Sequence, residues 1–235
     1  MLLELDRIDT FRGAAHVLRG VSLRVGDGEA VCLVGRNGAG KTTTLESAMG
    51  LLPVRAGRIV LRDRDVTRAP AHARARLGLG YAPEDAGIFP DLTVAENLML
   101  GKWLAQQGRG DGALVDERMR ALFPELETLV DRRGLNLSGG QKKMVAIARA
   151  LALAPAVLLL DEPFEGLAPV VVTRLVEAAR RIKAMGVSLL IAESNVTNAA
   201  RVADRLYAID RGEILFEGPP ARALDNVEVM KTLRG

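Results

Sequence analysis

Apolar and polar positions alternate in short blocks along the first third of the chain. Period-two alternation predicts strands with one buried face, and the continuous apolar run at residues 31–34 predicts a strand buried on both faces. The pattern predicts strands at residues 2–8, 21–25, 31–34, 57–61 and 80–82, and helices at residues 44–49 and 70–77. The first two strands flank a turn at Arg12-Gly13.

The middle of the chain has helical spacing and no convincing strand between residues 93 and 152. Two apolar faces define it, Val94/Leu98/Met99 and Leu114/Met119/Leu122, with a glycine-rich break at residues 108–112 between them. Beyond it, the pattern predicts strands at residues 157–160, 188–192, 205–210 and 213–217, and helices at residues 142–153, 169–185, 195–203 and at the C-terminus. Buried strands that alternate with helices predict one α/β domain with a mostly parallel sheet and a helical insertion.

Composition narrows the class without identifying the function. Of 235 residues, 49% are hydrophobic but only 3% are aromatic, and the net charge is +3 without any long basic run, so we expect no nucleic-acid partner. The single cysteine, Cys32, lies in an apolar strand and is expected in the core. The N-terminus does not resemble a signal peptide, and Pro155 interrupts the longest apolar run, residues 150–160. We therefore expect a soluble chain that reaches a membrane only through partners.

The segment GRNGAGKTT follows the apolar strand at residues 31–34 and precedes a helix. It matches the phosphate-binding P-loop, in which glycines let backbone amides converge on phosphate oxygens at a helix N-terminus. Lys41 would reach the β- and γ-phosphates, and the Thr42 hydroxyl would ligate magnesium. The predicted nucleotide-binding residues are Gly35, Arg36, Asn37, Gly38, Ala39, Gly40, Lys41, Thr42 and Thr43.

Two acids end the apolar strand at residues 157–160. Asp161 is placed to hold Mg²⁺ beside the P-loop, and Glu162 to act as general base toward the attacking water. Without the P-loop, the same acids would be read as solvated loop residues. The nucleotide motif makes them the predicted metal and catalytic groups.

A second glycine-containing turn, LSGGQ, opens the helix that follows it. Ser138 is suited to cap this helix, and Gly139 and Gly140 expose amides at its N-terminus. It is either an ordinary capped helix or a second phosphate cradle. Because one nucleotide scarcely needs two cradles from one chain, we expect Ser138, Gly139, Gly140 and Gln141 to serve a neighbouring subunit's nucleotide.

The three motifs, in this order and spacing, resemble the ATPase domain of ABC transporters over essentially the whole chain. The resemblance implies an α/β P-loop NTPase core with an antiparallel β subdomain (residues 1–84 and 155–235) and a helical subdomain at about 85–154. It also implies ATP and Mg²⁺ held between two chains that stack head to tail. Transmembrane permease subunits would hold that pair at the cytoplasmic face of the inner membrane.

Finer features are similar to the shorter ATPase subunit of branched-chain amino acid importers. Glu84 stands where most ABC ATPases have glutamine; IFPDLTVAENL follows at residues 88–98, and GLAP occupies residues 166–169. The resemblance implies that the segment from Glu84 to Leu98 senses the γ-phosphate and contacts the permease, and it places Glu84 with Thr42 and Asp161 at the metal. A separate substrate-binding protein would supply the cargo. Urea or amide importers and lipopolysaccharide exporters share much of the pattern.

Two positions depart from the family. Arg12 matches the family's adenine-stacking tyrosine, so either Arg12 or Phe11 would contact adenine, or Arg12 is a solvated turn residue. Ser194 stands where histidine or glutamine bonds the γ-phosphate, so we expect slow hydrolysis unless Glu162 suffices or Ser194 only caps a helix.

Three functional hypotheses remain. The first is the energy-coupling ATPase of an amino-acid importer. The second is a soluble ABC protein of repair or translation, disfavoured by the single P-loop and the lack of a heptad run. The third is a regulatory subunit with weak hydrolysis, which Ser194 keeps open.

Overall fold

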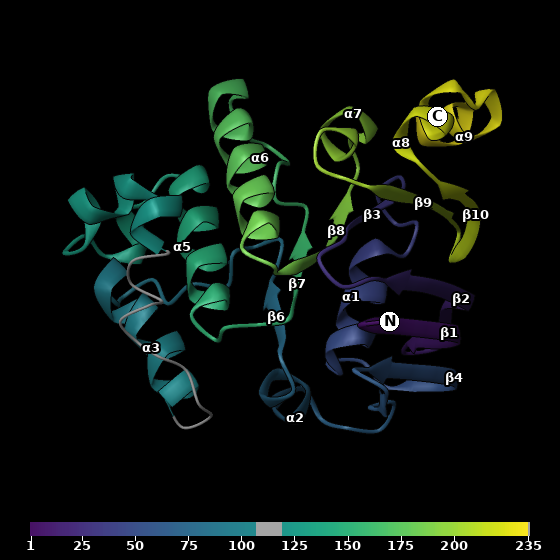
Figure 1. Ribbon diagram of the computed structural model, residues 1–235, viewed down its shortest axis with the longest axis horizontal. Helices are drawn as coiled ribbons and strands as arrows, with labels where there is room; N and C mark the ends of the chain where they lie inside the picture. Colours follow the sequence, from purple (N-terminus) through teal and green to yellow (C-terminus); the bar gives the residue numbers. More distant parts are fainter. Residues whose placement is uncertain (107–118, 235) are drawn as a thin grey trace.

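The computed structural model describes residues 1–106 and 119–234, and a six-stranded sheet forms their centre (Figure 1). Its strand order is β10-β9-β3-β8-β7-β6, and all neighbours pair in parallel except β10, which is antiparallel to β9. The strands are β3 (Ala30–Val34), β6 (Leu79–Ala82), β7 (Val157–Asp161), β8 (Ser188–Glu193), β9 (Arg205–Asp210) and β10 (Glu213–Gly218). The predicted mostly parallel α/β sheet is confirmed.

A second, antiparallel sheet has the order β2-β1-β4-β5. It contains β1 (Leu3–Arg12), β2 (Ala15–Val25), β4 (Val54–Leu61) and β5 (Arg64–Asp65). Three of these strands are longer than predicted, because their pairing continues through register shifts that break the period-two pattern. The two-residue β5 was not predicted, since it is too short to show any period.

The helices follow the predicted order with shifted ends. They are α1 (Lys41–Met49), α2 (Ala71–Arg76), α3 (Val94–Gln106), α5 (Gly139–Leu151), α6 (Pro169–Ala184), α7 (Val196–Ala200), α8 (Pro220–Asp225) and α9 (Val227–Arg234), with 3₁₀ turns η1 (Pro124–Leu129) and η2 (Gly134–Asn136). The α5 helix begins at Gly139 rather than Lys142, because the Ser138 cap tolerates glycine in the first turn. The α7 helix is shorter than predicted, and the C-terminal helix is two helices.

Within the described part of residues 93–152, no named strand occurs, as predicted, although Thr93 and Arg133 form an isolated bridge. Val94 is buried, whereas Met99, predicted on the same face, is 61% exposed. The predicted break at residues 108–112 and Leu114 lie outside the described residues. The subdomain boundaries at about 85 and 154 stay a prediction.

Two hydrophobic clusters cover the two faces of the central sheet. Alternate residues of β3 divide between them: Cys32 and Val34 join the cluster with α5, α6 and α7, and Val31 and Leu33 join the cluster with α1 and the antiparallel sheet. Figure 1 shows α3 and α5 at one end of the molecule and β1, β2 and β4 at the other. Among the helices of the described segments, none combines the length and hydropathy needed to cross a bilayer.

Cys32 is fully buried in β3, as predicted for a core residue. Burial, with the nearby charges of Glu193 and Asp204, raises the pKa of its thiol far above the ordinary value. The thiol is therefore protonated and shielded from reagents in water.

Arg74 of α2 is buried although it carries a charge, being only 2% exposed. Its guanidinium donates hydrogen bonds to the carbonyls of Ser47 and Ala48 at 2.8 and 2.7 Å, and to those of Ala69 and Thr67, both at 2.9 Å. The first two lie at the end of α1, where a helix leaves its last carbonyls without partners inside the helix; the Ser47 carbonyl also accepts from Gly50 N at 3.1 Å. Arg74 therefore joins the C-terminus of the P-loop helix to the segment that leads into α2.

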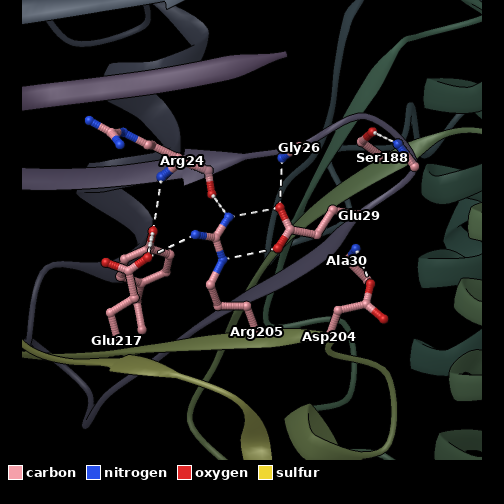
Figure 2. A network of polar contacts seen from close by, with 10 residues as sticks. Arg24, Gly26, Glu29, Ala30, Ser188, Asp204, Arg205 and Glu217 are labelled. Carbon is pink, nitrogen blue, oxygen red and sulfur yellow. Dashed lines mark hydrogen bonds and ion pairs between the residues drawn. The ribbon is translucent and has the colours of Figure 1, made fainter. Parts of the chain in front are cut away.

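A second arginine, Arg205, forms a polar network at the end of the central sheet where β3 begins, which is the end opposite the P-loop. Figure 2 shows this network. Arg205 donates to both carboxylate oxygens of Glu29 at 2.9 and 2.8 Å, to Glu217 at 2.8 Å and to the Arg24 carbonyl at 3.2 Å. Gly26 N also donates to Glu29. This network links β2, the start of β3, β9 and β10.

Candidate nucleotide site

The P-loop runs from the end of β3 to the start of α1. Gly38 and Gly40 have φ angles of +83° and +113°, which side-chain-bearing residues rarely adopt. At Gly35 a Cβ would lie 2.5 Å from the carbonyl of Ile209. No side chain caps α1, whose N-cap is Gly40. The N-terminal amides of α1 are therefore available to an anion, as the phosphate cradle requires.

Lys41 is buried beneath this loop, with 5% exposure. Its Nζ donates to the carbonyls of Gly35 and Arg36 at 2.7 and 3.1 Å, and lies 2.9 Å from Glu162 Oε1. The structure therefore brings together the lysine and the general base that the sequence predicted separately. Their ion pair was not foreseen, because residues this far apart in sequence give no signal of contact.

Asp161 lies at the end of β7, beside the P-loop helix. Its carboxylate accepts hydrogen bonds from Thr42 Oγ1 at 3.2 Å and Tyr81 Oη at 3.3 Å. Burial raises the pKa of Asp161 to about 6; the hydrogen bonds from Thr42 and Tyr81 oppose this shift, and the charges of Glu162 and Glu84 add to it. A cation held here would favour the ionised form.

The donors at this point fit a magnesium ion. A buried carboxylate and a neighbouring hydroxyl, Asp161 and Thr42, are the hard oxygen ligands that Mg²⁺ prefers, with substrate phosphates completing the shell. No cluster of three or more His, Cys, Asp or Glu side chains that could hold a metal occurs in the described segments. Glu84 is exposed and has no hydrogen bond or ion pair within those segments, so its role as a ligand stays a prediction.

Glu162 follows Asp161 in a left-handed backbone conformation, with φ +44°. Its N–H donates to the Ala192 carbonyl, and its Oε2 accepts from both the backbone N and the Oγ of Ser194, at 3.0 and 3.1 Å. A non-glycine residue at positive φ stores strain and is frequent at functional sites. The backbone turn and Ser194 together point the carboxylate toward Lys41.

Two charged residues near Glu162 were missed by sequence reasoning. Glu193, at the end of β8, is 1% exposed; Asn195 N donates to its Oε1, and its Oε2 has no hydrogen-bond partner in the described segments. Lys143 of α5 donates from Nζ to the Glu162 carbonyl. Lys143 lies outside the predicted motifs, and Glu193 directly precedes Ser194 but was given no role. An acid at the end of an apolar strand was a signal that could have flagged Glu193.

The LSGGQ turn caps α5 as predicted. Gln141 N donates to Ser138 Oγ at 3.3 Å, and Ser138 N donates to Gln141 Oε1 at 2.9 Å, which forms a capping box. A Cβ at Gly140 would lie 2.7 Å from a side-chain carbon of Val171, so α6 packs closely on this turn. No hydrogen bond or ion pair within the described segments joins this turn to the P-loop, and its role as a second phosphate cradle stays a prediction.

A sequence profile described as ABC transporter matches residues 18–165. The chain belongs to the ABC transporter family. It is 40% identical to the lipopolysaccharide export system ATP-binding protein of Escherichia coli (strain K12), over 94% of this chain and 91% of that protein. It is 33% identical to the high-affinity branched-chain amino acid transport ATP-binding protein of Pseudomonas aeruginosa, over 100% of both chains.

Solved structures agree with this assignment. An ATP-binding cassette of an ABC transporter in its ADP conformation superposes with a TM-score of 0.86 at 27% identity, over 100% of this chain and 98% of that chain. The predicted family and fold are confirmed. Because ABC cassettes are ATPases coupled to transport, the predicted enzyme class is confirmed as well.

The two residues predicted to contact adenine, Phe11 and Arg12, have different surroundings. The Phe11 ring stacks on His16, with centroids 4.3 Å apart, and the Arg55 guanidinium lies 4.5 Å from its centroid. His16 belongs to β2 and Arg55 to β4, which lie on either side of β1, so both sides of the Phe11 ring are engaged. Arg12 donates to Thr43 Oγ1 at 3.1 Å and pairs with Glu46 of α1. Arg12 is therefore the one of the two whose side chain contacts α1, and the adenine contact of either residue stays a prediction.

Replacing Ser194 with glutamine is expected to raise steady-state hydrolysis by the assembled transporter about tenfold or more, since one donor to developing charge commonly contributes 10²–10³ in rate. In the cassette, the serine side chain is engaged with Glu162 and is short. The measurement is phosphate release at saturating ATP. Ser194→Ala, which keeps the backbone donor to Glu162, is the control and should change the rate less than about threefold. An unchanged rate in Ser194→Gln would remove Ser194 as the cause of slow turnover.

Replacing Glu193 with glutamine is expected to stabilise the cassette increasingly as pH rises. Burial raises the pKa of Glu193 to about 7 from 4.5, and the charges of Glu162 and Glu165 add to the shift while the Asn195 hydrogen bond and Lys143 oppose it. The native state therefore holds its proton more tightly than the unfolded state, so wild-type stability falls between pH 4.5 and 7.

The glutamine side chain does not titrate. The gain in the free energy of unfolding over wild type should therefore be small near pH 4.5 and reach up to about 3 kcal/mol at pH 8. Urea unfolding at both pH values measures it. Glu213→Gln, on exposed β10, is the control for loss of a carboxylate. A stability difference independent of pH would contradict the assignment of a raised pKa to Glu193.

Proposed function

We propose that this chain is the ATP-hydrolysing, energy-coupling subunit of a transporter that imports branched-chain or related amino acids. One observation carries the catalytic part. Lys41, Thr42, Asp161, Glu162 and Ser194 come from three separate segments, and contacts at hydrogen-bond or ion-pair distance join Lys41 to Glu162, Thr42 to Asp161 and Ser194 to Glu162. This is the set that phosphate binding, metal binding and water activation require.

The reaction is ATP + H₂O → ADP + phosphate. The loop from Gly35 to Thr43 binds the phosphates through its amides and Lys41. Mg²⁺, held by Thr42 and Asp161, would neutralise phosphate charge. Glu162 accepts the proton of the attacking water, and Ser194 orients the Glu162 carboxylate. Entry of the γ-phosphate must exchange Glu162 for phosphate at Lys41, which releases the carboxylate for this role.

A second copy of the chain, or a homologous one, completes the site. The separate cradle at Ser138 to Gln141 supports this proposal, because it presents a capped helix N-terminus but no contact with its own P-loop in the described segments. Head-to-tail stacking would place it over the partner's nucleotide. The proposed dimer is thus closed by ATP and opened after hydrolysis.

The proposed contact with the permease lies on the helical side of the molecule, at the cytoplasmic face of the membrane. A groove of about 300 Å³ lies between α3 and the segment that includes η1, and the exposed side chains of Met99 and Trp103 stand on α3. Arg149 of α5 donates to the carbonyl of Gly87 at 2.7 Å and stacks over Phe89, so α5 is tied to the segment that follows Glu84.

The cargo rests on subfamily likeness. Glu84, the run at residues 88–98 and GLAP at residues 166–169 resemble branched-chain importers, and one such protein matches over its whole length. A lipopolysaccharide exporter is the second candidate, favoured by the 40% identity to such an ATPase. A weakly hydrolysing regulatory subunit is the third, favoured by Ser194.

Two measurements test the proposal. Light scattering of purified protein with ATP and EDTA should show an ATP-dependent dimer, which Ser138→Arg should abolish without loss of folding. Deletion of the gene should remove uptake of radiolabelled leucine, with permease and binding-protein genes adjacent to it. Normal leucine uptake together with accumulation of lipopolysaccharide at the inner membrane would reject the importer in favour of the exporter.

A further inference from the structure

The LSGGQ turn at residues 137–141, called the signature turn from here on, opens α5. Lys143 of this helix connects it to the loop of the same chain that carries Glu162. It lies two residues beyond Gln141, in the second turn of α5. Its side chain lines a small cavity with Pro83, Asp161 and Pro163, and its Nζ donates to the Glu162 carbonyl. The contact therefore joins α5 to the turn that follows β7.

The surroundings of Lys143 are acidic. Glu84, Glu162, Glu165 and Glu193 all lie close enough for their charges to act on it, while partial burial lowers its pKa. A cation at this point offsets the repulsion among these carboxylates as well as supplying a donor. Both effects favour one arrangement of the loop.

Glu162 needs such support because its backbone is strained. Its φ of +44° is a conformation that residues with a side chain rarely adopt and that persists only where neighbours enforce it. The Ala192 carbonyl holds the Glu162 N–H, Ser194 holds its carboxylate, and Lys143 holds its carbonyl. Of these groups, only Lys143 comes from the helical side of the molecule.

We propose that Lys143 is a positioning residue that fixes the backbone of Glu162. It thereby links the signature turn to the general base of the same chain. In the proposed dimer, the signature turn faces the nucleotide of the partner chain, and Glu162 faces the nucleotide of its own chain. The inference rests on the proposed dimer. The Ser138 capping box makes the signature turn and the first turns of α5 one rigid unit. Engagement of this turn by the partner's nucleotide then acts on Glu162 through a single side chain, which couples the two sites and gives cooperative hydrolysis.

The first test compares Lys143→Met, Lys143→Arg and Lys143→Gln with Lys142→Met as matched control. Lys142 is the adjacent lysine on α5, and its side chain makes no hydrogen bond or ion pair within the described segments. Lys143→Met should lower kcat at least tenfold, leave KM for ATP within about twofold and bring the Hill coefficient for ATP toward 1. Lys143→Arg should restore kcat to within about threefold of wild type.

The second test uses mixed dimers purified through two affinity tags, with Lys41→Ala disabling one P-loop. Lys143→Met on the chain with the intact P-loop should lower the rate as in the homodimer. On the chain that carries Lys41→Ala, it should be silent, because that chain contributes only its signature turn to the active site. An equal loss in both arrangements would show that Lys143 serves the signature turn itself, and would overturn the proposal.

The outcomes separate this inference from the proposed function. If wild type forms no ATP-dependent dimer and hydrolyses no ATP, the proposed function fails. If wild type does both and Lys143→Met keeps its kcat and Hill coefficient, only the inference fails. A fall in kcat that follows a fall in melting temperature and is not rescued by arginine would make Lys143 merely structural. Lys143→Gln provides the same readouts if the methionine variant does not fold.

Discussion

Replacing Glu162 with glutamine is expected to lower the ATPase rate by about 10²–10⁴, the usual contribution of a general base. Glutamine can still accept the hydrogen bonds from Ser194 through its amide oxygen, so the geometry at Oε2 is preserved. It cannot take a proton from water, and it removes the carboxylate that lies 2.9 Å from Lys41. Hydrolysis should fail while the phosphate cradle remains intact.

The same variant should retain ATP binding. Since wild type must exchange the Glu162 carboxylate at Lys41 for a phosphate, removing that carboxylate removes a competitor for the lysine. We expect nucleotide affinity at least equal to wild type, measured by fluorescent ATP titration beside phosphate release. Glu213→Gln serves as control. A rate within threefold of wild type would exclude Glu162 as the base.

Replacing Arg74 with alanine is expected to destabilise the protein by about 3–5 kcal/mol. The charged guanidinium donates to four carbonyls, and each such bond commonly contributes about 1.5–3 kcal/mol without full additivity. Alanine leaves these carbonyls without their side-chain donor, and the Ser47 carbonyl keeps the backbone N–H of Gly50 at 3.1 Å. Urea unfolding should show a lower midpoint with an unchanged slope.

Arg76 provides the matched control, because it is exposed on the same helix and its side chain has no hydrogen bond or ion pair in the described segments. Arg76→Ala should change stability by less than about 0.5 kcal/mol. Arg74→Lys keeps the charge but not the planar fork of donors, and should fall between wild type and alanine. A loss below 1 kcal/mol in Arg74→Ala would contradict the role given to these bonds.

Local patterns in the sequence were sufficient to predict most of the core. The continuous apolar runs of β3, β7 and β8 were recognised because a parallel sheet buries both faces, and β9 coincides with its predicted range. The Ser138 cap and the P-loop turn were recognised because their chemistry is local. Strand ends at β1, β2 and β4 were not, because pairing across bulges does not depend on the period of one strand.

The site was predictable as a set of motifs but not as a set of contacts. Three contacts of the site join segments that are distant in the sequence, and no sequence motif relates the residues that form them. They are the contacts of Lys41 with Glu162, of Tyr81 with Asp161 and of Lys143 with the Glu162 carbonyl. Arg74 was likewise invisible, because a lone arginine in a basic, alanine-rich helix reads as solvated. The positive φ of Glu162 is imposed by the strand that precedes it and the loop that follows it. Glutamate usually has a negative φ, so the residue type alone did not indicate this conformation.

The burial of Cys32 has a practical consequence for spectroscopy. Because the chain has one cysteine and its thiol is enclosed within β3, maleimide reagents should leave native protein unlabelled. A cysteine introduced at an exposed position, such as Asp27 in the turn before β3, would then be the single reactive thiol. One dye per chain would report the distance between two copies without a cysteine-free background, so association could be followed in real time by energy transfer.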